Sequence, residues 1–312
     1  MKQYCFGIDL GGTTIKSGLF TVSGELLQKW EISTRTEYGG ANILPDIAAS
    51  IRDVLTKNSI KTSQVLGAGL GVPGAVQADR IVAPCVNLNG WGGNVATKLS
   101  ELCGFPVKAV NDANAAALGE LWQGSGKGYE NVVFVTLGTG VGGGIIVNGK
   151  LLRGGHGAGG EIGHVKVNPD ETESCGCGKK GCLEQYASAT GVVRIAKRIL
   201  AASEKPSSLR EYEKVSSKAI FDEAKKGDKL ANEIVDAFGK MLGYGLATIS
   251  CVCDPDIFVI GGGVSAAGQI ILDRVKESFR KHAFPASEHT SFALASLGND
   301  AGIYGCAKLM AE

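Results

Sequence analysis

Two segments of the chain repeat one order of elements: an apolar strand, a turn rich in glycine and threonine, and a second apolar strand. The first spans residues 7–20 with Gly11-Gly12-Thr13 at its turn, and the second spans residues 132–147 with Gly138-Thr139-Gly140. Such turns present backbone N–H groups and a threonine hydroxyl, a concave arrangement that binds phosphate. Two of them facing across a cleft would hold a nucleoside triphosphate between two domains. The alternative is a pair of ordinary tight hairpin turns, which need fewer glycines.

The two common nucleotide-binding fingerprints are missing from the sequence. Neither turn reads G-x4-G-K-[ST], the P-loop pattern, and neither opens a helix with G-x-G-x-x-G, the Rossmann pattern. Glycine contributes 46 of the 312 residues, clustered at 11–12, 138–144, 154–160 and 261–263. Such clusters indicate loops in which the backbone approaches a ligand closely.

The overall composition is that of an ordinary globular protein. A length of 312 residues favours two domains. The chain is 44% hydrophobic and 20% charged with a net charge of +1, so nothing calls for a nucleic acid or membrane partner. Because no targeting segment precedes the first predicted strand, we expect a cytoplasmic protein.

Hydrophobic patterning predicts an α/β fold. Three antiparallel strands are expected at 4–9, 15–20 and 26–32. Further strands are expected at 65–71, 107–110, 132–137, 144–147 and 257–260, and helices at 43–55, 113–122, 188–202, 217–226, 229–251, 265–281 and 301–310. We expect residues 1–112, with a C-terminal helix at about 300–312, to form a small α/β domain. Residues 113–299 would form a larger α/β domain.

Two aspartates follow predicted buried strands, where ligands bind in open α/β sheets. Asp112, after the strand at 107–110, suits a general base that accepts a proton from an attacking hydroxyl. Its alternative role is that of a helix N-cap. Asp9, at the first phosphate turn, suits the orientation of Mg²⁺ through water.

Four further polar residues form a set of carboxylate and amide acceptors: Asn87, Asn111, Glu161 and Glu184. Clustered hydroxyls on a small ligand call for such acceptors. Because no arginine clamp for a substrate carboxylate is evident, the set indicates a sugar.

His164, Cys175, Cys177 and Cys182 have the composition and spacing of a structural zinc site. The three cysteines are spaced C-x-C-x4-C, and Cys₃His is a standard tetrahedral ligand set for Zn²⁺. With four protein ligands, no coordination position stays open for catalysis. The alternatives are a disulfide or buried free thiols. The other six cysteines lie mostly in apolar stretches and are expected to be small buried hydrophobic residues.

Six motifs together resemble the ROK family (repressor, open reading frame, kinase). They are Asp9-Leu-Gly-Gly-Thr13, Gly71-Val-Pro-Gly74, Asn111-Asp-Ala-Asn114, Leu137-Gly-Thr-Gly-Val-Gly-Gly-Gly144, Glu161-Ile-Gly-His164 and the run Cys175–Glu184. The match covers nearly the whole chain. Within the family, the segments 154–164, 187–191 and 297–302 resemble the ATP-dependent glucokinases of bacteria most.

The resemblance implies an actin-like, hexokinase-type ATPase fold (RNase H-like), with two domains around a cleft and a zinc loop at 164–182. It implies phosphorylation of D-glucose to glucose 6-phosphate with Mg·ATP, with Asp112 as the base on the 6-hydroxyl. Sugar hydroxyls would be held by Asn111, Asp112, Glu161, His164 and Glu184. The nucleotide would be bound through Gly138, Thr139 and Gly261, Gly262 and Gly263. The family habit also predicts a homodimer.

Two kinds of alternative function stay open. One is a kinase for another hexose, such as N-acetylmannosamine, fructose or a β-glucoside, which motif spacing does not separate from a glucokinase. The other is a non-catalytic sugar-sensing repressor. A repressor needs an N-terminal helix-turn-helix of some sixty residues, and here the first predicted strand begins at Tyr4. A sugar-binding module would not need Asp112 or two phosphate turns.

Overall fold

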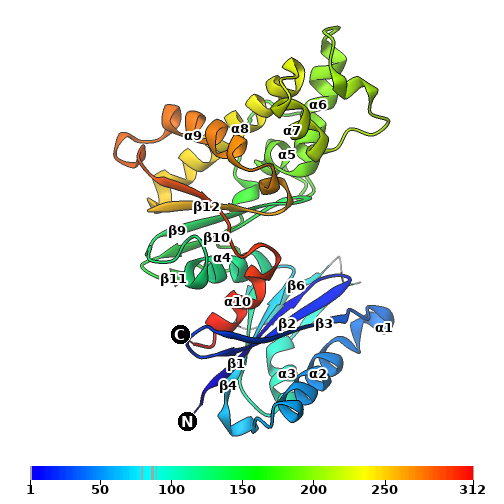
Figure 1. Cartoon of the computed structure of the whole chain (residues 1–312), viewed down its shortest axis with the longest axis vertical. Helices are drawn as coiled ribbons and strands as arrows, with labels where there is room; N and C mark the ends of the chain where they lie inside the picture. The colour runs from blue at the N-terminus through cyan, green and yellow to red at the C-terminus, as the bar shows by residue number, and fades with distance from the viewer. Residues whose placement is uncertain (1, 79, 86–87, 89, 312) are drawn as a thin grey trace. The chain divides into compact units, whose positions relative to one another are not determined.

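The computed structural model describes residues 2–78, 80–85, 88 and 90–311 (Figure 1). The chain forms two compact units. Unit 1 comprises Met1–Gly128, Leu151–Gly160 and Ser296–Glu312, and unit 2 comprises Tyr129–Lys150 and Glu161–Ala295.

Each unit is built on a five-stranded mixed sheet. The first sheet contains β1 (Tyr4–Leu10), β2 (Thr14–Thr21), β3 (Leu26–Ser33), β4 (Val65–Val72) and β8 (Val107–Asn111). The second contains β9 (Val132–Leu137), β10 (Val141–Val147), β11 (Lys150–Leu151), β12 (Ile257–Gly261) and β13 (Ser291–Leu294). A small sheet contains β5 (Val76–Gln77), β6 (Arg80–Cys85) and β7 (Trp91–Gly93).

The two large sheets share one topology, and the predicted strand–turn–strand repeat is one part of it. Their strand orders are β3-β2-β1-β4-β8 and β11-β10-β9-β12-β13. In the first, β1 pairs antiparallel with β2 and parallel with β4, which is parallel to β8. In the second, β9 pairs antiparallel with β10 and parallel with β12, which is parallel to β13. The predicted antiparallel start, β1-β2-β3, is confirmed.

The helices divide between the units. Unit 1 contains α1 (Glu37–Gly40), α2 (Ile43–Lys57), α3 (Val95–Cys103), α4 (Asp112–Gln123) and α10 (Ala301–Lys308). Unit 2 contains α5 (Glu184–Ala187), α6 (Ala189–Ala202), α7 (Ser217–Lys225), α8 (Lys229–Cys253) and α9 (Gln269–His282). Short 3₁₀ turns include η3 (Ile162–His164) and η5 (Gly263–Ala267). The helix predicted at 265–281 is therefore η5 followed by α9, because Gly268 between them has a φ of +81°.

Both faces of the unit 1 sheet are covered. Phe6 and Ile8 of β1 belong to the core under α2 and α3, whereas Cys5 belongs to a cluster with Ile303 and Ala307 of α10. This alternation follows from the two-residue period of a strand. On the α10 side, a Cβ at Gly69 would overlap the carbonyl of Cys306, so the helix lies directly against the strand backbone.

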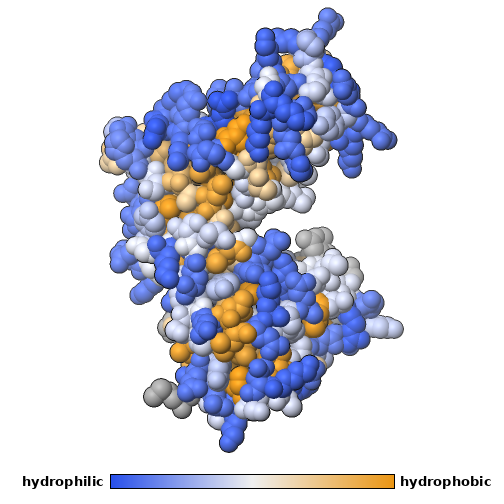
Figure 2. All heavy atoms as spheres, viewed as in Figure 1, coloured by the Kyte–Doolittle hydropathy of each residue, from blue (hydrophilic) through white to orange (hydrophobic). Residues whose placement is uncertain are grey.

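Unit 2 has its own core around α8. This helix packs against α5, α6, α7 and α9, and its buried residues Phe238, Leu242 and Leu246 share a cluster with Phe258 of β12. Although α8 is long and apolar, no helix among the described residues is long and apolar enough to cross a membrane. The face drawn in Figure 2 is mainly hydrophilic, and hydrophobic residues show only in smaller groups.

The unit boundary differs from the predicted one at residue 112, because α4 lies in unit 1. This helix packs against α10. Its fully buried Glu120 accepts hydrogen bonds from the backbone N–H groups of Ser296 (3.2 Å) and Leu297 (2.8 Å). These bonds attach the C-terminal segment, which re-enters unit 1 at Ser296, to α4. The helix and this segment therefore belong to the same unit.

Candidate active site

The first glycine turn has the structure of a phosphate-binding hairpin. It connects β1 to β2, and the Gly11 N–H donates to the Thr14 carbonyl at 3.1 Å. The Thr34 hydroxyl donates to the Gly11 carbonyl at 2.7 Å and supports the turn from β3's end. Among the described residues, the N–H groups of Gly12 and Thr13 have no acceptor, and both residues are exposed. They are available to an anion.

Asp9 and Asp112 lie at one edge of the unit 1 sheet. Asp9 is near the end of β1, and Asp112 follows β8, which runs parallel to β1 through β4. The carboxyl ends of parallel strands meet at one edge, where ligands bind in such sheets. Burial, together with the charge of Asp112, raises the pKa of Asp9 to about 6, and the charge of Lys16 opposes this shift.

Asn111, not Asp112, is the N-cap of α4. Its Oδ1 accepts from the N–H groups of Ala113 (3.0 Å) and Asn114 (3.1 Å), and its Nδ2 donates to the Gly74 carbonyl at 3.1 Å. The N-cap role considered for Asp112 is therefore filled by Asn111. Asp112 is the first helical residue, where a carboxylate is favoured by the helix dipole.

The second glycine turn connects β9 to β10 in unit 2. The Gly138 N–H donates to the Gly140 carbonyl at 3.0 Å, and in the described part of the chain the N–H groups of Thr139 and Gly140 have no acceptor. The predicted glycine run at 261–263 lies beside it, since a Cβ at Gly262 would be 2.5 Å from the Leu137 nitrogen. Gly262 has a φ of +84°, which also favours glycine.

A pocket of about 450 Å³ adjoins this turn. Its lining includes Thr139, the α6 residues Val193, Arg194 and Lys197, and the segment 214–217. No motif in the sequence marks this pocket. Its cationic residues look like ordinary solvated charges on an amphipathic helix, so no local signal distinguishes them.

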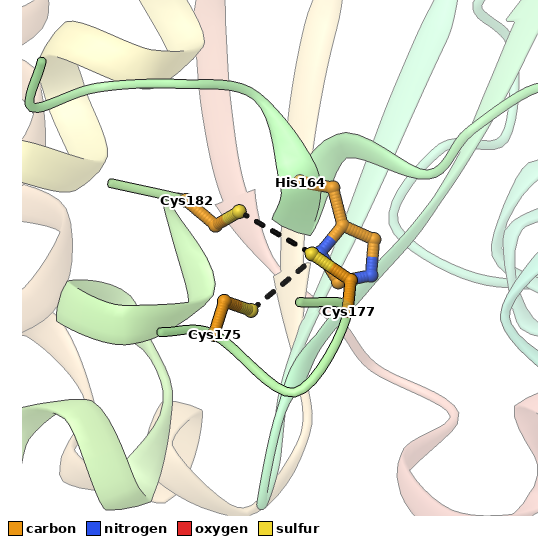
Figure 3. Close-up of side chains that lie close together, drawn as sticks. All are labelled: His164, Cys175, Cys177 and Cys182. Carbon is orange, nitrogen blue, oxygen red and sulfur yellow. Dashed lines mark hydrogen bonds between the residues drawn. The ribbon is translucent and has the colours of Figure 1, made fainter. Parts of the chain in front are cut away.

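The four predicted zinc ligands converge in unit 2 (Figure 3). Their ligand atoms all lie within 4.8 Å of one another. The Sγ atoms of Cys177 and Cys182 are 3.7 Å apart, and Cys175 Sγ is 3.9 Å from His164 Nδ1. Sulfurs bound at 2.3 Å to a tetrahedral Zn²⁺ would be about 3.8 Å apart, so the donor set fits this ion.

Local backbone geometry explains why this segment closes on itself. The Cys175 N–H donates to the Lys179 carbonyl at 2.7 Å, and the Gly178 N–H donates to the Cys175 carbonyl at 2.9 Å. Gly181 has a φ of +77°, and a Cβ there would overlap the Asn168 carbonyl. Of the remaining cysteines, Cys5, Cys85, Cys103 and Cys306 are buried as predicted. Cys251 is exposed instead and Cys253 is only partly buried, because both lie in the last turn of α8.

The predicted acceptors Glu161 and Glu184 lie on either side of the cysteine cluster. His164 turns Nδ1 toward the cysteines, and its Nε2 is 4.0 Å from Glu161 Oε2. Glu184 Oε1 is 3.5 Å from Cys175 Sγ, and Glu184 Oε2 accepts from the Val141 N–H at 2.9 Å. One carboxylate thus contacts both the cysteine cluster and the strand after the second glycine turn. Asn87 lies outside the described residues.

Comparison with known proteins agrees with this geometry. The ROK family profile matches residues 5–312. The chain belongs to the ROK family. It is 41% identical to a glucokinase of Halalkalibacterium halodurans over 97% of this chain and 93% of that protein.

Two solved structures extend the comparison to the fold. A ROK hexokinase from Thermus thermophilus has a TM-score of 0.83 and 32% identity over 97% of this chain and 96% of that one. A ROK glucokinase from Streptomyces griseus, in complex with glucose and AMPPNP, has a TM-score of 0.76 and 34% identity over 98% of both chains. The predicted actin-like fold of ROK sugar kinases is confirmed.

Proposed function

We propose that this ROK protein is a glucokinase that transfers the γ-phosphoryl group of ATP to the 6-hydroxyl of D-glucose. The observation that carries the proposal is the placement of Asp9 and Asp112 at the ligand-binding edge of the unit 1 sheet, next to a phosphate-type turn. Its relatives include proteins named glucokinase, and one was solved with glucose and an ATP analogue.

Asp112 has the role of general base. Its carboxylate accepts the proton of the 6-hydroxyl while that oxygen forms a bond to the γ-phosphorus, and the bond from phosphorus to the β-phosphate oxygen breaks to release ADP. Its backbone position is set by the cap at Asn111, which anchors the start of α4. Asn111 retains one Nδ2 hydrogen for a sugar oxygen.

The two glycine turns, at Gly11–Thr13 in unit 1 and Gly138–Gly140 in unit 2, bind phosphate through the N–H groups of Gly12, Thr13, Thr139 and Gly140. A Mg²⁺ ion bound with ATP would neutralise phosphate charge, and Asp9 would orient it through water. The pocket beside Thr139 has the volume and the apolar walls that a purine nucleoside requires, with cationic side chains at its edge.

In unit 2, the carboxylates of Glu161 and Glu184 accept hydrogen bonds from sugar hydroxyls, and His164 donates one to a sugar oxygen. A zinc ion on His164 Nδ1 and the three cysteines would keep this segment folded and would leave Nε2 protonated for a sugar oxygen. We also propose the homodimer predicted from the family, which light scattering on the purified chain would test.

The decisive experiment is Asp112→Asn in a coupled ADP-release assay with glucose and Mg·ATP. The variant keeps the shape of the side chain but removes the base, so kcat should fall by at least about 10²-fold. Glucose binding by titration calorimetry should be largely retained. Asp53→Asn, at an exposed position of α2, is the control.

Near-normal turnover of Asp112→Asn would remove Asp112 from the mechanism. A panel of hexoses in the same assay separates glucokinase from a kinase for N-acetylmannosamine, fructose or a β-glucoside. If another sugar has a much higher kcat/KM than glucose, the reaction type stands and the substrate assignment is wrong.

A further inference from the structure

A network of ion pairs fastens the cysteine-containing segment to α6 without involving any metal ligand. We call it the Glu171 clamp, and its members are Glu171, Glu173, Tyr186, Arg194 and Arg198. Glu171 is only 6% exposed. It accepts from Arg194 Nη2 at 2.7 Å, from Arg198 Nη2 at 3.1 Å and from the Tyr186 hydroxyl at 2.5 Å.

The clamp is closed by a second carboxylate and by a stacked ring. Glu173 accepts from Arg194 Nη1 at 3.1 Å and from Arg198 Nη2 at 2.6 Å, so two guanidinium groups bridge two carboxylates. The Arg194 guanidinium lies 5.0 Å from the centre of the Tyr186 ring. Planar guanidinium groups suit such multiple bonds, and lysine would not replace them.

Gln185 connects the clamp to the backbone at Gly181 and Cys182. Gln185 Oε1 accepts from the N–H groups of Gly181 (2.8 Å) and Cys182 (3.1 Å). Gln185 Nε2 donates to the Glu173 carbonyl at 3.0 Å, and Arg194 Nε donates to the Gln185 carbonyl at 3.2 Å. Gln185 therefore links the clamp to the backbone around Cys182.

Glu184 is the sugar-binding candidate next to these bonds in the chain. It lies between Gln185 and the last cysteine, and it reaches the Val141 N–H at 2.9 Å. A zinc ion would fix this segment only at residues 164, 175, 177 and 182. The stretch 168–174 and the start of α5 are held by the clamp.

The energetics favour a positioning role over a purely stabilising one. A buried carboxylate loses its hydration, and pairing with two guanidinium groups offsets that loss without a large net gain. Removal of one partner, in contrast, leaves an uncompensated buried charge. The arrangement therefore contributes defined geometry more than it contributes free energy of folding.

We infer that Glu171 and Arg194 are positioning residues for Glu184, so that sugar binding depends on the clamp even when all four zinc ligands are present. This inference rests on the proposed glucokinase function. Arg194 also lines the pocket beside Thr139, so its variants would alter nucleotide binding as well. Glu171 lines neither this pocket nor the smaller one next to Glu184, and it is the residue to test.

The experiment compares Glu171→Gln with the wild-type protein in three measurements. The KM for glucose should rise about tenfold or more, whereas the KM for ATP should stay within about twofold. Zinc content by mass spectrometry should be unchanged. Zinc release to a chromophoric chelator should be about tenfold faster, because the segment opens more often.

Two further variants make the result interpretable. Tyr186→Phe removes a single donor from Glu171 and should change glucose KM and zinc release in the same direction, by about two- to threefold. Glu233→Gln removes a carboxylate from an exposed ion pair with Lys205 in the same unit and should change neither. If Glu171→Gln does not fold, Tyr186→Phe decides the question.

Unchanged glucose KM and unchanged zinc release in a folded Glu171→Gln, or in Tyr186→Phe, would overturn the inference. Equal rises in KM for glucose and ATP would also overturn it, because they would indicate a general loss of structure. If the wild-type protein does not phosphorylate glucose, the proposed function fails, and the zinc-release comparison still tests the clamp.

Discussion

Asp9 has an environment that opposes its ionisation, although its proposed role requires a charge. Burial and the neighbouring charge of Asp112 raise its pKa to about 6. The start of α10 lies against it, since a Cβ at Gly302 would be 2.6 Å from Asp9 Oδ2. A Mg²⁺ ion bound with ATP near Asp9 would add positive charge beside its carboxylate and so favour the ionised form.

We predict that Asp9→Asn stabilises the ligand-free protein in a pH-dependent manner. The folded-state pKa is raised, so the protonated carboxyl favours folding at low pH and this contribution is lost as pH rises through about 6. The difference between variant and wild type should grow from about pH 4, near the ordinary pKa of aspartate, to about pH 7, toward about 2–3 kcal/mol. Urea unfolding without nucleotide or magnesium measures it.

A constant difference across this pH range would contradict the assignment of the shift to Asp9. Although Asp9→Asn should stabilise the protein, it should lower the kinase activity, because it removes the carboxylate proposed to orient Mg²⁺. Asp53→Asn, at an exposed position, serves as the control and should show no such trend.

Between elements, the contact of α10 with its neighbours depends on glycine. A Cβ at Gly305 would overlap the carbonyl of Ala115 in α4, and a Cβ at Gly7 would overlap the carbonyl of Ile303. The backbones therefore approach more closely than any side chain allows. This contact holds the C-terminal helix on β1, the strand that carries Asp9.

We predict that Gly305→Ala destabilises the protein by about 2–3 kcal/mol through overpacking, measured by urea unfolding. Activity should fall as well, because α10 packs beside Asp9. Gly155→Ala is the matched control: a Cβ there meets nothing within 4 Å, and its effect should stay within about 0.5 kcal/mol. Equal effects of the two substitutions would show that the close approach of α10 and α4 is not needed.

For the molecule as a whole, the important fact is that each unit has its own hydrophobic core. The core under α2 and α3 belongs to unit 1, and the core around α8 belongs to unit 2. All four candidate zinc ligands are in unit 2. Loss of the metal should therefore affect the units unequally.

We predict that Cys177→Ser loses zinc and weakens glucose binding strongly, while ATP binding stays nearly intact. Hydrogen exchange should become faster over residues 162–185 and stay unchanged in unit 1, because unit 1 has a hydrophobic core of its own. Exchange mass spectrometry and metal analysis on one sample measure both effects. A zinc-free variant that binds glucose normally would show that the cysteine cluster does not position the sugar-binding carboxylates.

Local features of this protein can be predicted from sequence because their partners are close along the chain. The strand–turn–strand repeats follow from apolar periodicity and from glycine at the turns. The zinc ligands follow from spacing, since His164 and Cys182 are separated by few residues and Gly178 and Gly181 allow the backbone to fold back. The family motifs extend such predictions to the α/β fold.

Other features depend on contacts between distant segments, which periodicity does not encode. Glu171 bonds to Arg194 and Arg198 across 23 and 27 residues, and each of these side chains alone resembles a solvated surface charge. The attachment of α4 to the C-terminal segment of unit 1 depends on the hydrogen bond that Glu120 accepts from the Ser296 N–H, 176 positions away in the chain. Likewise, the pKa of Asp9 is set by burial and by a charge some hundred residues later in the chain. These properties arise only when tertiary packing excludes water and brings the partners together.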